Sequence, residues 1–232
     1  SFFSKYSLLR RFLRAEINGL YSLKNGGYLV IAKKGIFYKN NHSSVFRKVF
    51  SIPRGSRPLN LCELPNGHIY WGEYFANIEK EAVHIYVSID GGLTWKIAYT
   101  FSEGNINHIH GLFWDEFTNR LWFCTGDREN ECIIGYTEDE FKTIVEVFRG
   151  NQEYRSCQLF FYEHFVVFAT DSQYVQNEIK MFARDSMQIN SLVKIQGTAI
   201  KGGQLGNISF LSTTVEPSEM NKDRHSHLWI TD

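Results

Sequence analysis

Basic side chains precede carboxylates by nearly the same interval three times in this sequence. Arg57 precedes Glu73 and Arg155 precedes Asp171 by 16 residues each, and His110 precedes Asp127 by 17. Glu216 continues the acidic series near the end of the chain. Such pairs can carry out acid–base chemistry on a ligand, or they can close on themselves as repeated salt bridges. The spacing leaves both interpretations open.

Two histidines lie beside one of these carboxylates in sequence order. His108 and His110 alternate within "HIHG", so on a strand both side chains point to one side of the sheet. Two such imidazoles can supply a general base or can bind a divalent metal ion. Because an isolated His-x-His pattern is weak evidence for a metal, we expect no cofactor. The predicted catalytic residues are His108, His110, Glu73, Asp127 and Asp171.

The remaining candidates would bind the ligand. The planar guanidinium of an arginine favours carboxylate, sulfate or phosphate groups. Arg57 and Arg155 therefore suggest an anionic ligand, for which an acidic sugar is the natural candidate. Tyr154, beside Arg155, and Glu216 complete the predicted substrate-binding set.

The elements that would position these residues are short strands. Around residues 60–101 we identify "LNLCEL", "HIYWGEYF", "VHIYVSI" and "WKIAYTF", which are rich in β-branched and aromatic residues. Four similar runs occupy each of the next two segments of about fifty residues. A period of this length with four antiparallel strands per repeat predicts a β-propeller. The predicted fold class is all-β.

One turn recurs with this period. "SIDGGLTW", residues 88–95, has partial copies 49 residues later in "TEDEFKTI" and 49 residues earlier in "KNNHSSVF". Asp90 can accept hydrogen bonds from turn amides, and Gly91 and Gly92 permit positive φ. Trp95 can anchor the turn between neighbouring sheets.

"SIDGGLTW" resembles the Asp-box (BNR) motif Ser/Thr-x-Asp-x-Gly-x-Thr-Trp of sialidase-like β-propellers, with matches at Ser88, Asp90, Gly92, Thr94 and Trp95. The resemblance implies that the box joins the third and fourth strands of a blade. It also implies that the boxes lie on the face opposite the binding site, so that Asp90 and Asp139 have an architectural role. From about Arg54 to Asp232 the chain also resembles bacterial BNR-repeat proteins of uncertain activity.

The strand count predicts a single propeller domain over residues 1–232. Its blades are expected at about 15–52, 57–101, 107–148 and 155–197, with an incomplete fifth at 200–232. Because a closed ring hides its strand edges, the sequence suggests a fragment of a six- or seven-bladed ring. A five-bladed ring with a shared closing strand is the rival interpretation.

Propeller geometry places the loop before a blade's first strand and the loop after its second strand on one face. All the predicted site residues fall in or beside such loops, on the face opposite the Asp-box hairpins. We therefore expect a carbohydrate-active propeller that hydrolyses or eliminates an anionic glycan on that face. The alternative is a non-catalytic propeller that binds a glycan or another protein. The resemblance does not imply sialidase activity, because "SIPRGSRP" differs in residue order and position from the sialidase Arg-Ile-Pro motif.

Composition limits the partners. Lys plus Arg equals Asp plus Glu, 25 each, so no overall charge would attract nucleic acid. No apolar run approaches the roughly 20 residues of a membrane span. Cys62, Cys124, Cys132 and Cys157 show no CxxC pair and suggest a cytoplasmic protein. The first residues neither show nor exclude a removed signal peptide.

Overall fold

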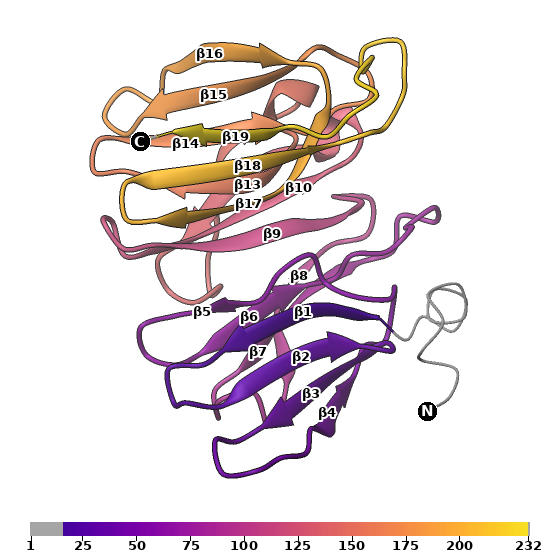
Figure 1. The fold of residues 1–232 in the computed structure, drawn as a ribbon, viewed down its shortest axis with the longest axis vertical. Coiled ribbons are helices and arrows are strands. Elements are labelled where there is room, and N and C mark those ends of the chain that lie inside the picture. Colours follow the sequence, from indigo (N-terminus) through magenta and orange to yellow (C-terminus); the bar gives the residue numbers. More distant parts are fainter. Residues whose placement is uncertain (1–15, 232) are drawn as a thin grey trace.

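The computed structural model describes residues 16–231, and in them the protein is a β-propeller (Figure 1). The expectations for residues 1–15 and Asp232 lie outside the described part. The first sheet contains β1 (Ile17–Ser22), β2 (Tyr28–Ala32), β3 (Gly35–Lys39) and β4 (Arg47–Ser51). The second contains β5 (Cys62–Glu63), β6 (Ile69–Gly72), β7 (Val83–Ser88) and β8 (Lys96–Phe101).

The other three sheets follow in chain order. The third contains β9 (His108–Asp115), β10 (Arg120–Gly126), β11 (Ile133–Thr137) and β12 (Val145–Arg149), and the fourth β13 (Ser156–Phe161), β14 (Phe165–Thr170), β15 (Asn177–Ala183) and β16 (Ile189–Ile195). The fifth contains β17 (Thr198–Leu205), β18 (Ile208–Thr214) and β19 (Leu228–Thr231). Two 3-10 turns, η2 (Glu129–Glu131) and η3 (Gln152–Tyr154), are the helical elements of residues 16–231.

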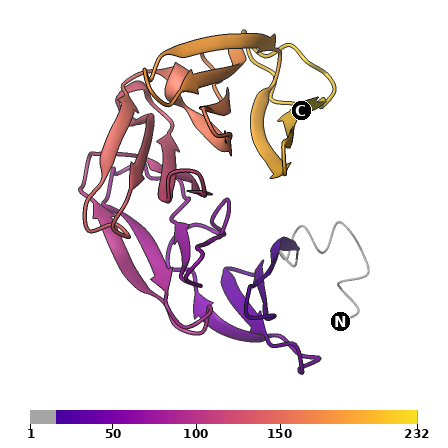
Figure 2. The same ribbon diagram turned by 90° about the vertical axis from the view of Figure 1, so that its left-hand side faces the viewer.

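Each sheet is an antiparallel meander whose strands pair in chain order, so the predicted all-β propeller is confirmed. The sheets succeed one another around a common axis, as Figure 2 shows. The first strands approach each other from neighbouring blades: β9 contacts β5 and β13, and β13 contacts β17. Within residues 16–231, no strand of the first sheet pairs with a strand of the fifth. No described helix has the length and apolarity needed to cross a membrane.

Aromatic side chains fill the layers between adjacent blades. Between the first and second sheets, Trp71 is fully buried and stacks on Tyr86 with ring centroids 4.3 Å apart. Phe50 of the first sheet packs edge-on against Trp71, and Trp95 packs on both. Trp95 therefore occupies the apolar layer that the sequence predicts for it. Burying each large apolar side chain contributes about 1.5–3 kcal/mol, which holds neighbouring blades in register.

Two hairpin turns at matching positions in the second and third blades are closed by the same set of internal hydrogen bonds. Asp90 accepts hydrogen bonds from the Ser88 hydroxyl at 2.7 Å and from the Thr94 amide and hydroxyl at 2.9 and 2.6 Å. Asp139 accepts the same set from Thr137 and Thr143 at 2.9, 2.9 and 2.7 Å.

These two turns also share their backbone shape. Gly91 and Gly92 have φ of 73° and 93°, and Glu140 and Phe141 adopt 59° and 69° at the equivalent positions. Glycine adopts positive φ without steric cost, whereas a side chain there is strained. Each hairpin joins the third and fourth strands of its sheet, β7 to β8 and β11 to β12. In an antiparallel meander these turns lie on the face opposite the loops that join second to third strands.

The innermost strands carry β-bulges at corresponding places. In β9, Gly111 pairs with Cys124 and Ile109 with Thr125, which leaves His110 as the extra residue. Asn18 is the extra residue in β1 and Ile200 in β17, and β13 is irregular between Ser156 and Leu159. A bulge re-aims the side chain it carries, so this repeated irregularity shapes what faces the axis.

Candidate functional site

A depression of about 710 Å³ opens on the face that carries the loops between second and third strands; we call it the basin. It is lined by Lys34, Gly55, Ser56, Tyr74, Phe75, Ala76, Asn77, Ile78, Lys80, Asn107, His108, Asp127, Arg128 and Tyr174. These residues come from the first four blades. The face agrees with the one predicted from propeller geometry, and the Asp90 and Asp139 turns lie on the other.

Three predicted catalytic residues, His108, His110 and Asp127, lie together at the basin; we call them the polar centre. His108 and Asp127 line the basin, and His110 is buried directly behind them. The Nε2 atoms of the two histidines lie 3.1 Å apart. Asp127 Oδ1 lies 3.1 Å from His110 Nε2 and 3.4 Å from His108 Nε2. Both imidazoles are buried, whereas the Asp127 side chain keeps about a third of its surface exposed.

The second nitrogen of each imidazole is fixed by a backbone carbonyl. His108 Nδ1 lies 2.8 Å from the Phe75 carbonyl oxygen, and His110 Nδ1 lies 3.2 Å from that of Ser156. Burial lowers the pKa of His110 to about 4, although the adjacent Asp127 carboxylate opposes this shift. For Asp127, burial acts to raise the pKa, but the adjacent imidazoles of His108 and His110 outweigh it and hold that pKa well below its usual range. Asp127 is therefore ionised and His110 neutral near pH 7.

Arg155 joins the polar centre to a deeper group of buried residues. Its Nη2 lies 3.0 Å from Asp127 Oδ1, and its Nε lies 3.8 Å from Asp171 Oδ2. The Cys157 thiol donates to the same Asp171 oxygen at 3.3 Å. Asp171 Oδ1 and Arg155 Nε are buried with no hydrogen-bond partner among the described residues. Burial raises the pKa of Asp171 to about 7 in spite of the Arg155 charge.

Local backbone geometry explains how these side chains converge. His110 is the bulged residue of β9, and Cys157 lies in the irregular stretch of β13, so both leave the regular alternation of their strands. Gly126 ends β10 directly against the His110 ring. A Cβ at Gly126 would lie 2.3 Å from His110 Cε1, so a larger residue there would displace the imidazole.

The rim of the basin is basic and aromatic. Lys34 and Arg128 are exposed, and neither forms an ion pair with any residue in the described range. Lys80 is held by Glu131 and contacts Asn107 Oδ1 at 3.4 Å. Tyr74 lies beside the polar centre, with its ring centroid 4.3 Å from that of His108. Burial raises the pKa of Tyr74 to about 12, so its hydroxyl stays protonated.

Two predicted residues are engaged elsewhere. Glu73 is fully buried and accepts hydrogen bonds from the Arg54 guanidinium and the His84 amide, so its partner is Arg54 and not the predicted Arg57. Arg57 instead donates to Asn18 Oδ1 at 2.9 Å, toward the first blade. Because the Glu73 carboxylate is saturated inside the protein, it has the geometry of a structural ion pair.

Two further candidates lie away from the polar centre. Tyr154 belongs to η3, and its ring stacks on Phe148 with centroids 5.3 Å apart, within the apolar layer of the third and fourth blades. Glu216 follows β18 and accepts a hydrogen bond from Thr198 at 3.1 Å. Its charge still acts on Asp171, whose pKa it helps to raise. The structure brings neither residue to the basin.

Sequence reasoning missed several basin residues. Tyr74 directly follows Glu73 and Asn107 directly precedes His108, so loop position could have identified both. Cys157 lies in an apolar run that gives no sign of a contact with a carboxylate, and in the structure it lies in the irregular stretch of β13 and contacts Asp171. Lys34, Lys80 and Arg128 come from three different blades and carry no shared motif.

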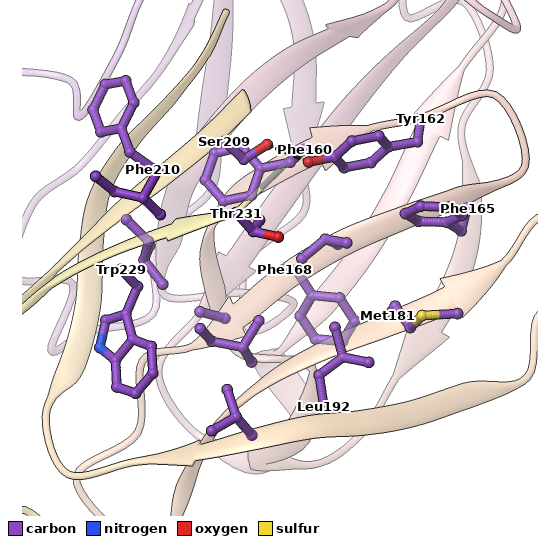
Figure 3. A pocket seen from close by; sticks show the side chains of 16 residues that line it. Phe160, Tyr162, Phe165, Phe168, Met181, Leu192, Ser209, Phe210, Trp229 and Thr231 are labelled. Carbon is purple, nitrogen blue, oxygen red and sulfur yellow. Dashed lines mark hydrogen bonds between the residues drawn. The ribbon is translucent and has the colours of Figure 1, made fainter. Parts of the chain in front are cut away.

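A second cavity, of about 380 Å³, lies between the fourth and fifth sheets (Figure 3). Figure 3 shows it lined almost entirely by apolar side chains such as Phe160, Phe168, Met181 and Trp229. The hydroxyls of Tyr162 and Ser209 there bond to each other at 2.7 Å. This cavity offers no converging charged groups, so the basin is the stronger candidate site.

No family model matches the sequence, and no curated protein matches it. Solved structures of β-propellers do match. A structure titled as a nidogen/laminin complex is 12% identical with a TM-score of 0.63, over 86% of this chain and 73% of that one. An ancestral GH74 enzyme is 8% identical with a TM-score of 0.58, over 94% of this chain and 33% of its own.

A putative exo-beta-1,3-galactanase from Bifidobacterium bifidum s17 is 10% identical with a TM-score of 0.58, over 92% of this chain and 90% of its own. The chain therefore spans most of the galactanase but only a third of the GH74 enzyme. At such identities the likeness shows a shared propeller fold, and the chemistry has to be argued from the site.

Proposed function

We propose that this protein is a carbohydrate-active propeller that binds an anionic glycan in the basin. The observation that carries the proposal is the composition of the lining, in which Lys34, Lys80 and Arg128 accompany a single carboxylate, Asp127. An excess of positive charge in a concave site favours an anionic ligand. Tyr74 and Tyr174 add aromatic surface on which a sugar ring can pack.

The Asp-box resemblance and the neighbours support the same proposal. The hydrogen bonds of the Asp90 and Asp139 turns fit an architectural role on the opposite face. Two of the similar propellers, the ancestral GH74 enzyme and the putative exo-beta-1,3-galactanase, are glycoside hydrolases. At these sequence identities the substrates of the similar enzymes are not assigned to this chain. The proposal of an acidic sugar therefore depends on the charge of the basin alone.

Of the two predicted reactions, elimination fits the basin better than hydrolysis. Hydrolysis by paired carboxylates requires both of them to flank the scissile bond. Asp127 lines the basin, but Asp171 is buried beneath Arg155 and Glu73 is saturated by Arg54. Elimination from a uronate needs positive charge beside its carboxylate, a base that removes the proton on the carbon next to it, and a proton for the oxygen that leaves the adjacent carbon. Lys34 and Arg128 supply the charge, His108 with Asp127 accepts the proton, and the Tyr74 hydroxyl donates one to the leaving oxygen.

The binding proposal is tested by neutralising the rim. We expect Lys34→Gln combined with Arg128→Gln to weaken binding of trigalacturonate roughly tenfold, since exposed charge contacts contribute up to about 1 kcal/mol each. Isothermal titration calorimetry measures the affinity, with the methyl-esterified trisaccharide as the neutral comparison ligand.

Lys33→Gln is the matched control, because Lys33 is an exposed neighbour of Lys34 that does not line the basin. Equal binding of the charged and neutral trisaccharides, or equal losses in the control and the double variant, would contradict the proposal. Formation of an unsaturated product by the wild type, absent in Asp127→Asn, would identify the reaction as elimination.

A further inference from the structure

The hydrogen-bond partners of the polar centre decide where its protons lie. A backbone carbonyl can only accept, so the Phe75 oxygen at 2.8 Å requires a proton on His108 Nδ1. The Ser156 oxygen places the proton of His110 on Nδ1 in the same way. A neutral imidazole carries one N–H, so each Nε2 is left with a lone pair.

The Asn107 amide also lies 3.2 Å from His108 Nδ1 but does not change this assignment. Its Nδ2 donates to Asp127 Oδ2 at 2.9 Å, which is the shorter of its two contacts. An unprotonated Nδ1 would place its lone pair against the Phe75 oxygen at 2.8 Å, which is repulsive. The carbonyl therefore fixes the tautomer.

Three acceptor atoms consequently face one another. The Nε2 atoms of His108 and His110 and Asp127 Oδ1 lie between 3.1 and 3.4 Å apart with no proton of their own to share. Arg155 Nη2 donates to Asp127 Oδ1 and, within the described residues, forms no hydrogen bond with either Nε2. Buried lone pairs at this distance repel each other unless a cation lies between them.

The distances match those of a metal site. Ligands of a four-coordinate zinc ion, with metal–nitrogen bonds of about 2.0–2.1 Å, are separated by roughly 3.3 Å. A metal-bound histidine usually donates its other N–H to a backbone carbonyl or a carboxylate, as both histidines do here. Two imidazoles and one carboxylate leave further coordination positions open.

We propose that His108, His110 and Asp127 bind a divalent transition-metal ion of the zinc type, with an open coordination position toward the basin. His108 and Asp127 both line the basin, so an anionic ligand there would reach the ion. The inference deepens the proposed function, because the ion would place a divalent charge beside the glycan carboxylate. The His108 lone pair would then be used by the metal, leaving Asp127 Oδ2 and the Tyr74 hydroxyl for proton transfer.

A second group of potential ligands lies close by and must be distinguished from the first. His110, Cys157 and Asp171 also bring their ligand atoms within 4.8 Å of one another. In that group Arg155 approaches Asp171, the Cys157 proton is donated to Asp171, and neither Cys157 nor Asp171 lines the basin. The facing lone pairs favour the first group.

The test uses the full chain freed of metal by chelation and titrated with zinc chloride against a chromophoric chelator, with no glycan present. We expect one zinc ion per chain and a rise in melting temperature on binding. His108→Gln and Asp127→Asn should each weaken zinc binding at least tenfold, because each removes a ligand. His68→Gln is the matched control, since His68 pairs with Glu140 on the opposite face and should bind zinc as the wild type does.

Circular dichroism checks the fold of each variant, and Asp127→Asn keeps the test decisive if His108→Gln does not fold, because Asp127 is partly exposed. Absence of stoichiometric zinc binding, or unchanged affinity in a folded Asp127→Asn, would overturn the proposal. Cobalt(II) in place of zinc should show no thiolate-to-metal charge-transfer band. Such a band, lost in Cys157→Ser, would assign the metal to the deeper group instead.

Because the titration contains no glycan, its result is independent of the rim variants. Loss of the metal proposal would leave anion binding by Lys34 and Arg128 standing, and loss of glycan binding would leave the metal site standing.

Discussion

Asp139 and Asp171 are carboxylates in adjacent blades, and their surroundings shift their pKa values in opposite directions. Asp139 is in an exposed turn, where the Thr143 amide and the hydroxyls of Thr143 and Thr137 lower its pKa to about 2. Asp171 lies inside the molecule, where burial raises its pKa to about 7 and one oxygen has no partner within the described part of the chain.

The difference distinguishes a carboxylate that stabilises the fold from one that can act on a ligand. A carboxylate that its own turn saturates has nothing left to offer a ligand, whereas a buried and incompletely paired carboxylate stores free energy that a site can use. The same contrast distinguishes Glu73, saturated by Arg54, from Asp127 at the floor of the basin. All four side chains are carboxylates, so their surroundings and not their chemical group make the difference.

The largest expected effect comes from removing the cation that Asp127 and Asp171 share. Arg155→Met should lower the free energy of unfolding by about 3 kcal/mol, because it leaves Asp127 and Asp171 without their shared positive charge. Urea denaturation at pH 7 measures the change. Arg120→Met is the control, since Arg120 pairs with a largely exposed Glu138 and should lose no more than about 1 kcal/mol. Equal losses would show that Arg155 is no more than a surface ion pair.

A smaller effect should appear as a dependence on pH. The raised pKa of Asp171 means that the folded state holds a proton which the unfolded state releases above its ordinary pKa of 3.8. Asp171 therefore reduces stability progressively as the pH rises from about 4 to about 7. Arg155, Cys157, Glu216 and Asp127 are the groups that act on it.

His110 acts in the opposite direction over part of this range. Its pKa of about 4 means that the unfolded state takes up a proton below pH 6.5 that the folded state refuses, so its contribution to stability rises with pH. The two contributions oppose each other in the wild type. Asp171→Asn should therefore gain stability relative to the wild type between pH 4 and 7, measured by urea denaturation in the presence of a chelator. A constant difference across this range would show that Asp171 ionises normally.

The smallest effect is expected on the opposite face. Asp90→Asn should cost about 1 kcal/mol and lower the melting temperature by roughly 2–4 °C, because it weakens the hydrogen bonds that close the turn. Asp139→Asn should lower the melting temperature in the same direction. Neither variant should change the affinity for trigalacturonate, and a loss of binding in either would break the separation of the two faces.

The sequence predicted the fold because its signals are local. Runs of β-branched and aromatic residues and the "SIDGGLTW" turn lie within one blade each, and their period sets the architecture. It also placed His108, His110, Asp127, Arg155 and Asp171 together, since loop position in a propeller sorts residues by face.

The parts that could not be predicted depend on single-residue irregularities and on packing. The interval that pairs Arg155 with Asp171 also pointed to Arg57 for Glu73, but Arg54 is the residue that reaches it. Tyr154 directly precedes Arg155 in the sequence, but it belongs to η3, where its ring stacks on Phe148. Side chains at a bulge do not follow the regular alternation between the two faces of a strand, on which strand predictions depend.

The recurring bulges provide equivalent positions in the innermost strands of several blades. Asn18, His110 and Ile200 occupy them in three blades, and each residue stands outside the hydrogen-bond ladder that holds its sheet together. A substitution at such a point alters what projects into the middle of the ring while leaving strand pairing intact. The scaffold can therefore acquire or discard a ligand-binding group one blade at a time, and a histidine installed at Ile200 would be the simplest way to redesign it.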